Sequence, residues 1–151
     1  MKTLLVAVDF SDASRQVIAY AAGLARDLSA RLILLHVVEP IASYVPVGTA
    51  MDVIETAPPP VLETDFEAHR NRLRQLAEGL PEAEVIAIVG LAGEEIVTQA
   101  AVHDAAFIVL GSHGHGALYH LFAGSVVTGV LKRSKIPVLV VPVAGKDAPK
   151  S

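Results

Sequence analysis

Short apolar runs alternate with amphipathic stretches along most of the chain. Five of these runs are continuous and rich in Val, Ile and Leu, which is typical of strands buried on both faces of a sheet. They cover residues 3–8, 31–38, 85–89, 107–110 and 138–141. Between them, apolar residues recur at the three- and four-residue spacing of amphipathic helices. The alternation predicts an α/β fold, with a single doubly wound, five-stranded parallel sheet and helices on both faces.

Helices are predicted after each of the first four strands. The segments run up to residue 29, over residues 61–80, from residue 94 onward, and over residues 125–133. Ser11 or Asp12 is expected to cap the first helix by accepting hydrogen bonds from its first N–H groups. The inward faces of the second and third helices are expected to comprise Phe66, Leu73, Leu76, Leu80, Ile96, Val97, Ala100 and Ala101.

The domain organisation is simple. Residues 1–144 are predicted to form one domain, and residues 145–151 a flexible tail. Residues 39–60 contain most of the prolines and predict a long surface loop, whose role stays open. We find no internal repeat and no second domain.

Composition and charge exclude several classes of function. Hydrophobic residues make up 52% of the chain and aromatic residues 5%, so the core must be aliphatic. The net charge of −4 argues against nucleic-acid binding, and the absence of cysteine excludes disulfides and thiolate metal sites. The N-terminal apolar run is too short for a signal peptide, and no apolar stretch approaches the roughly 20 residues of a membrane span. A cytoplasmic protein without nucleic-acid or membrane partners is expected.

The most informative stretch is residues 111–126, which read GSHGHGALYHLFAGSV. Glycines at 111, 114 and 116 follow a predicted strand and are expected to allow positive φ and close approach to a ligand. Gly124 and Ser125 stand where the last helix would begin, and the N-terminus of a helix favours an anion. The stretch therefore predicts a phosphate cradle; the alternative is that these glycines are plain turn residues.

The expected position of the site follows from the fold class. Ligands of doubly wound sheets bind outside the carboxyl ends of the strands, where the strand order reverses. Asp9, the residues after Val37, and Gly111 all lie at such ends. Asp9 is expected to contact a ribose or base, although a helix-capping carboxylate is the alternative. For Ser125 the alternative to phosphate contact is a plain N-cap, and for Ser11 capping is at least as well supported as a phosphate or metal role.

The histidines suggest one ligand contact. His113 lies within the glycine stretch and is expected to hydrogen-bond phosphate, more strongly once it is protonated below about pH 6.5. With His115 and His120 it could form a metal site, but no local carboxylate or cysteine joins them, so no metal is predicted. His36 is expected to be a hydrogen-bonded histidine near the core. His69 and His103 are expected to be surface helix residues.

Several motifs together resemble a known family. The spacing G-x2-G-x9-G-S, the opening AVDFSDAS, the strand LILLHVVEP and the closing KIPVLVVPV resemble the ATP-binding branch of the universal stress protein family over nearly the whole chain. The resemblance implies a strand order of 3-2-1-4-5 and a homodimer formed through the last strand, Val138–Val141. It also implies a regulatory role in the stress response, with protein partners that the sequence does not identify.

The resemblance also implies which residues bind the nucleotide. Asp9 matches the acidic residue that contacts the nucleoside, and Val37 matches a residue packed on adenine. Together with Ser11 and His113, the predicted nucleotide-binding residues are Ala7, Val8, Asp9, Ser11, Val37, Leu110, Gly111, His113, Gly114, Gly124, Ser125 and Val126. ATP is the expected ligand, AMP and ADP are alternatives, and Mg or Mn is an optional companion of the phosphates. Position 7 is often proline in ATP binders and is alanine here, so phosphate binding is better supported than packing on adenine.

Catalysis has little support. The Walker A motif and the G-x-S-x-G motif are absent, and the glycine stretch contains no lysine. No catalytic residue is predicted, and at most slow ATP hydrolysis is expected. Three functions therefore compete: an ATP-binding regulatory dimer, a slow ATPase or nucleotide-dependent transferase, and a stress protein that binds no nucleotide and acts by protein interaction.

Overall fold

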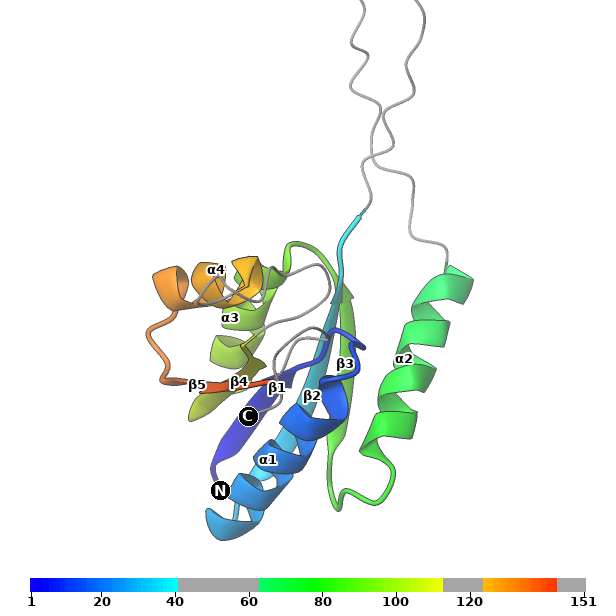
Figure 1. The fold of residues 1–151 in the computed structure, drawn as a ribbon. Helices are drawn as coiled ribbons and strands as arrows, with labels where there is room; N and C mark the ends of the chain where they lie inside the picture. Colours follow the sequence, from blue (N-terminus) through cyan, green and yellow to red (C-terminus); the bar gives the residue numbers. More distant parts are fainter. Residues whose placement is uncertain (41–62, 113–123, 144–151) are drawn as a thin grey trace, which may run out of the picture.

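A computed structural model describes residues 1–40, 63–112 and 124–143 of the chain (Figure 1). Strands and helices alternate throughout, as predicted. They are β1 (Thr3–Ala7), α1 (Ser14–Asp27), β2 (Arg31–Val38), α2 (Glu63–Ala77), β3 (Glu84–Val89), α3 (Ala92–Val102), β4 (Phe107–Gly111), α4 (Ser125–Arg133) and β5 (Val138–Val141). Most of the loop predicted over residues 39–60, and the tail, lie outside the described residues. None of the described helices is long and apolar enough to cross a membrane.

The five strands form one parallel sheet in the order β3-β2-β1-β4-β5, which confirms the order implied by the family resemblance. β1 occupies the centre of the sheet, between β2 and β4. Leu4, Leu5 and Val6 of β1 are all 0% exposed. The continuous apolar runs in the sequence thus reflect burial on both faces, as in other parallel sheets.

Helices cover the two faces of the sheet in pairs, with α1 and α2 on one face and α3 and α4 on the other (Figure 1). Successive side chains of a strand point to opposite faces. Leu4 and Val6 therefore pack beneath α1 and α2, and Leu5 packs beneath α3 and α4. This alternation decides which side of the molecule each predicted site residue faces.

The start of α1 differs from the prediction. The residue that precedes the helix is Ala13, which has a helical conformation and makes no side-chain cap. The expected capping by Ser11 or Asp12 is therefore wrong. The chain instead enters the helix through a backbone turn, in which the Ser14 N–H donates to the Ser11 carbonyl at 3.0 Å.

The start of α3 is also earlier than predicted, at Ala92 rather than Glu94. The Ala92 N–H donates to Oε1 of Glu39 at 2.9 Å, so a side chain at the end of β2 satisfies the N-terminus of this helix. Ala101, predicted to be buried, is exposed, because it lies about 100° round the helix from the buried Ala100.

α3 and α4 approach each other closely at a pair of glycines. A Cβ atom added to Gly93 would lie 3.4 Å from Cα of Gly129, and one added to Gly129 would lie 3.5 Å from Cα of Gly93. The two backbones thus lie close enough that a single methyl group would fill the space between them where the helices cross. Glycine at both positions makes this close crossing feasible.

Leu73 tests the packing of α2. It is 0% exposed and belongs to the core beneath α1 and α2. Replacing it with alanine should lower the free energy of unfolding by about 2–5 kcal/mol, because it deletes buried methyl groups and leaves a cavity. Leu131→Ala, at a position of α4 that is 54% exposed, should change stability by less than about 0.5 kcal/mol. Urea unfolding of both variants measures the difference, and equal effects would show that α2 is not packed as described.

Candidate functional site

The carboxyl ends of the parallel strands meet at one end of the sheet, where the sequence places its candidate residues. Ala7 ends β1 and pairs with Leu35 of β2, while Gly111 ends β4 and pairs with Val141 of β5. The strand order reverses across β1, since its sequence neighbour β2 lies on one side and β4 on the other. This is the crevice position at which doubly wound sheets bind ligands.

Ser112 fixes the ends of the glycine stretch. Its N–H donates to the Val141 carbonyl at 2.9 Å, and its Oγ accepts from the Val143 N–H at 3.0 Å. Its own carbonyl accepts from the Gly124 N–H at 3.2 Å. The chain therefore leaves β4 and returns to α4 at the same point. Sequence analysis did not assign Ser112 a role, although a polar residue directly after a buried strand is a usable signal.

The N-terminus of α4 lies beside this closure. Gly124 is the N-cap residue, with φ −67° and ψ 165°, and makes no side-chain cap. The alternative that Ser125 is a plain N-cap is therefore wrong, because Ser125 is the first residue of the helix. The first helical bond runs from the Thr128 N–H to the Gly124 carbonyl at 3.1 Å, so the N–H groups of residues 125–127 precede it. Ser125 and Val126 are exposed at this positive end of the helix dipole.

The glycines differ from the expectation in one respect. Gly111 does not have a positive φ, because it continues the β4 strand; among the described glycines only Gly79 has one. Gly124 also has an ordinary negative φ, and the nearest heavy atom to an added Cβ would be the Ser112 oxygen at 3.9 Å. Position 124 therefore has room for a small side chain. His113 and Gly114 lie outside the described residues.

Asp9 organises the turn that follows β1. Its side chain is exposed, and Oδ1 accepts from the Ser11 N–H at 2.9 Å and from the Ser14 hydroxyl at 3.1 Å. The carboxylate thus stabilises the entry into α1, which agrees in part with the capping alternative. Its position at the carboxyl end of the central strand places the same group at the mouth of the crevice.

Three of the predicted residues share one face of the sheet. Ala7, Val37 and Leu110 all pack within or against the cluster beneath α3 and α4. Val8 is 5% exposed and belongs to the core on the opposite face, so the structure does not bring its side chain together with the others. Val8 and the other three residues therefore face opposite sides of the sheet.

An aromatic cluster lies next to the turn that contains Asp9, on the face of the sheet that α1 and α2 cover. Phe10, His36 and His69, hereafter the aromatic stack, have ring centroids 4.3 Å (Phe10–His36), 5.0 Å (His36–His69) and 5.9 Å (Phe10–His69) apart. His36 is half-buried, and its Nδ1 lies 2.7 Å from the Val8 carbonyl, which confirms the prediction of a hydrogen-bonded histidine near the core.

His69 was predicted to be a surface residue, and this is wrong. Its Nδ1 is buried and has no hydrogen-bond partner within the described part of the chain. Its ring instead stacks on those of Phe10 and His36. His103 is only partly exposed and is the C-cap residue of α3. Among the described residues, no group of three His, Asp or Glu is arranged to hold a metal.

Comparison with known proteins identifies the family. The universal stress protein family model matches residues 1–142. The chain belongs to this family. A universal stress protein of Thermus aquaticus is 33% identical over 141 residues, which is 93% of this chain and 98% of that protein. The family assignment that the sequence motifs suggested is therefore confirmed, while its ATP-binding branch is not.

Solved universal stress proteins have the same fold. The chain is similar to UspA from Lactobacillus plantarum, with a TM-score of 0.68, 26% identity, and coverage of 93% of this chain and 97% of that chain. It is also similar in fold to a universal stress protein in complex with cAMP, with a TM-score of 0.65, 24% identity, and coverage of 93% and 96%.

The buried histidine gives a prediction about pH. Burial lowers the pKa of His36 below its ordinary value of 6.5, and although the hydrogen bond to Val8 acts in the opposite direction, burial is the larger effect. Well above pH 6.5, His36 is therefore neutral in both the folded and the unfolded chain. Below it, the unfolded chain binds a proton that the folded chain resists, so the free energy of unfolding falls until the pH passes the folded pKa.

The comparison that isolates this effect uses His36→Asn, whose amide can still donate to the Val8 carbonyl but does not titrate. The stability of the wild type minus that of the variant should be constant above about pH 7 and should shrink as the pH falls below 6.5. Urea unfolding between about pH 5 and 8 measures it. A difference that stays constant over this range contradicts the lowered pKa.

Proposed function

We propose that this universal stress protein binds an adenine nucleotide, ATP in the first place, and acts as a regulatory dimer in the stress response. One observation carries the proposal: Ser112 and Gly124 bring the uncapped N-terminus of α4 to the carboxyl end of β4. This positions the first-turn N–H groups of a helix that begins with Ser125 for a phosphate. AMP and ADP are alternative ligands, and Mg or Mn is an optional companion of the phosphates.

The nucleoside would occupy the crevice next to this helix. The partly buried Ala7 and Val37 provide aliphatic side chains on one face of the sheet, and the exposed Asp9 provides a carboxylate at the end of β1. Leu110 is 3% exposed, so only its backbone would be near the ligand. A carboxylate is a good acceptor for ribose hydroxyl groups. The universal stress protein that carries cAMP supports the choice of an adenine nucleotide, since it shows that this fold can hold one.

Binding without fast turnover is the form of the proposal that the sequence supports. Residues 111–126 contain no lysine or arginine, which phosphoryl-transfer sites usually use to stabilise developing charge. The bound state rather than a reaction product would then carry the regulatory information. Slow hydrolysis would reset that state without changing the site.

The experiment that tests the proposal is mass spectrometry of the small molecules released when the purified protein is denatured without added nucleotide. Release of ATP, ADP or AMP at about one molecule per chain is expected. A protein that is empty and also binds no added adenine nucleotide would refute the proposal and leave the fold intact.

Position 124 provides the sharpest variant. Gly124→Asp should weaken ATP binding by about a hundredfold or more, because a carboxylate would lie beside phosphate charges of the same sign. Gly124→Ala is the matched control and should bind like the wild type, since the backbone conformation suits alanine and, among the described residues, the added Cβ would come within 4 Å of the Ser112 oxygen alone, at 3.9 Å. Isothermal titration calorimetry measures both. If the aspartate variant binds ATP as tightly as the wild type, the N-terminus of α4 is not part of the nucleotide site.

The proposed dimer uses the edge strand β5. β5 ends the sheet next to β4, and Leu139 at its middle is 38% exposed. An apolar edge strand is a template for pairing with another chain. Leu139→Lys should therefore convert a dimer of twice 15.8 kDa into a monomer, as measured by light scattering at micromolar concentration. Leu131→Lys, at an exposed position on α4, should leave the dimer intact. A wild-type monomer would refute this part of the proposal.

A further inference from the structure

The aromatic stack joins three elements that are distant in the sequence. Phe10 lies in the turn after β1, His36 lies on β2, and His69 lies on α2. The stacking distances are within the range in which aromatic rings attract each other. No prediction about nucleotide binding includes these rings, and they lie on the face of the sheet opposite to Ala7, Val37 and Leu110.

Phe10 is held in an unfavourable backbone conformation. Its φ is +59°, in the left-handed region that a non-glycine residue rarely adopts. Such a conformation persists only when the surroundings impose it. The surroundings here are His36 on one side of the ring and the guanidinium of Arg72, whose Cζ lies 4.2 Å from the ring centroid. The contacts of the Phe10 ring therefore set the backbone of the turn that carries Asp9.

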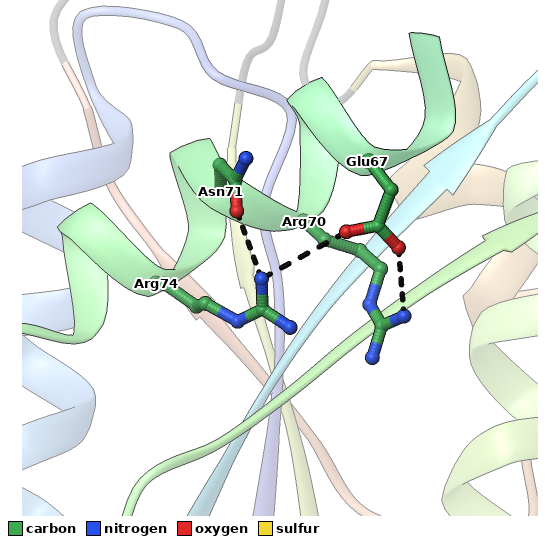
Figure 2. Close-up of polar contacts among 4 residues, drawn as sticks. All are labelled: Glu67, Arg70, Asn71 and Arg74. Carbon is green, nitrogen blue, oxygen red and sulfur yellow. Dashed lines mark hydrogen bonds and ion pairs between the residues drawn. The ribbon is translucent and has the colours of Figure 1, made fainter. Parts of the chain in front are cut away.

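Arg72 is the arginine of α2 that contacts the Phe10 ring. Its neighbours Arg70 and Arg74 are instead turned to Glu67 (Figure 2). Their guanidinium groups lie 3.0 Å (Arg70) and 3.9 Å (Arg74) from its carboxylate. Arg74 also donates to Oδ1 of Asn71 at 2.8 Å. The polar network on the exposed side of α2 thus accounts for two arginines. The third lies over Phe10 and adds a fixed positive charge to the aromatic stack.

His36 is arranged to be neutral. A carbonyl only accepts hydrogen bonds, so Nδ1 of His36 carries the hydrogen that is shared with the Val8 carbonyl, and Nε2 is the atom that would gain a proton. The ring of His69 stacks at 5.0 Å from that of His36, and its Nδ1 is buried without a partner in the described residues. A charge on the His36 ring would face His69 and Arg72.

The remaining groups around the stack are few. The charged residue that favours a proton on His36 is Asp9, whose carboxylate lies in the turn next to Phe10. β3 places Ala87 beside His36 and so contributes no charge at that position. Asp12, just before α1, and Arg15, in its first turn, line a cavity of about 340 Å³ that also borders Phe10 and Arg72. Their charges are therefore also near the Phe10 ring.

We propose that the aromatic stack is a proton-operated latch: Phe10, His69 and neutral His36 hold the turn so that Asp9 stays available to the proposed nucleotide site, and protonation of His36 releases it. The latch rests on the proposed nucleotide binding and is a way to regulate it by pH. Protonation places like charges against Arg72, which loosens the ring contacts that maintain the left-handed conformation of Phe10. A charged His36 also attracts the Asp9 carboxylate away from the ligand. Both effects lower nucleotide affinity in mildly acidic solution, because burial keeps the pKa of His36 below 6.5.

The first test measures ATP affinity against pH by calorimetry for the wild type and for His36→Asn. The variant keeps a donor for the Val8 carbonyl but cannot be protonated at this position. Wild-type affinity should fall by about tenfold more than that of the variant between about pH 7.5 and 5.5, the change expected if binding shifts the proton affinity by one pKa unit. Titration of the ATP phosphates, and of protein groups that both proteins share, cancels in the comparison. His103→Gln, remote on α3, is the control and should behave like the wild type. Identical profiles for wild type and His36→Asn overturn the latch.

The second test needs no nucleotide and separates failure of the latch from failure of the proposed function. The Ser11 N–H donates to the Asp9 carboxylate, so its amide signal in NMR reports the position of that group. This signal should shift with the same midpoint as the His36 ring signals, and should not shift in His36→Asn over that range. Histidine rings that titrate while the Ser11 signal stays still overturn the latch. If ATP binds at no pH, the proposed function fails, and this NMR comparison alone decides whether the stack controls Asp9.

Discussion

Burial of β1 on both faces and along both edges constrains the rest of the molecule. A central strand of a parallel sheet can present polar groups only where it ends. Its residues Leu4 to Val6 are fully buried, and the first exposed side chain after them is Asp9. The first polar side chain that the strand exposes after this buried run thus lies at the carboxyl end of the sheet. The closure of β4 onto α4 by Ser112 then brings a helix N-terminus to the same place.

The sequence predicted the regular elements well because hydrophobic periodicity determines them. The limits of the last helix and the last strand agree with the structure to the residue, and the strand order implied by the family resemblance is correct. The start of α1 was not predictable from cap preferences, because the Asp9 carboxylate bonds the Ser11 N–H and the Ser14 hydroxyl across the turn. That geometry depends on the backbone path of the turn, which the spacing of residues in the sequence does not indicate.

The candidate site was predicted in part, for similar reasons. Gly124 and Ser125 stand out in the sequence and do begin a helix. The expected positive φ at Gly111 failed because pairing with Val141 extends the strand through it. The aromatic stack was missed because it depends on the left-handed conformation of Phe10, which brings a ring from a turn against two histidines. His69 was placed at the surface although it lies three residues after Phe66 and four before Leu73, a spacing that puts it on the inward face of α2.

The glycine crossing of α3 and α4 makes the spacing of these two helices sensitive to small changes. A single Cβ at Gly93 or Gly129 would be in van der Waals contact with the other glycine, and a longer side chain would have to push the two helices apart. Such a shift of α4 would also act on its first residues, which the Gly124 N–H ties to the Ser112 carbonyl. The position of the α4 N-terminus thus depends on two glycines that lie outside every motif of the candidate site.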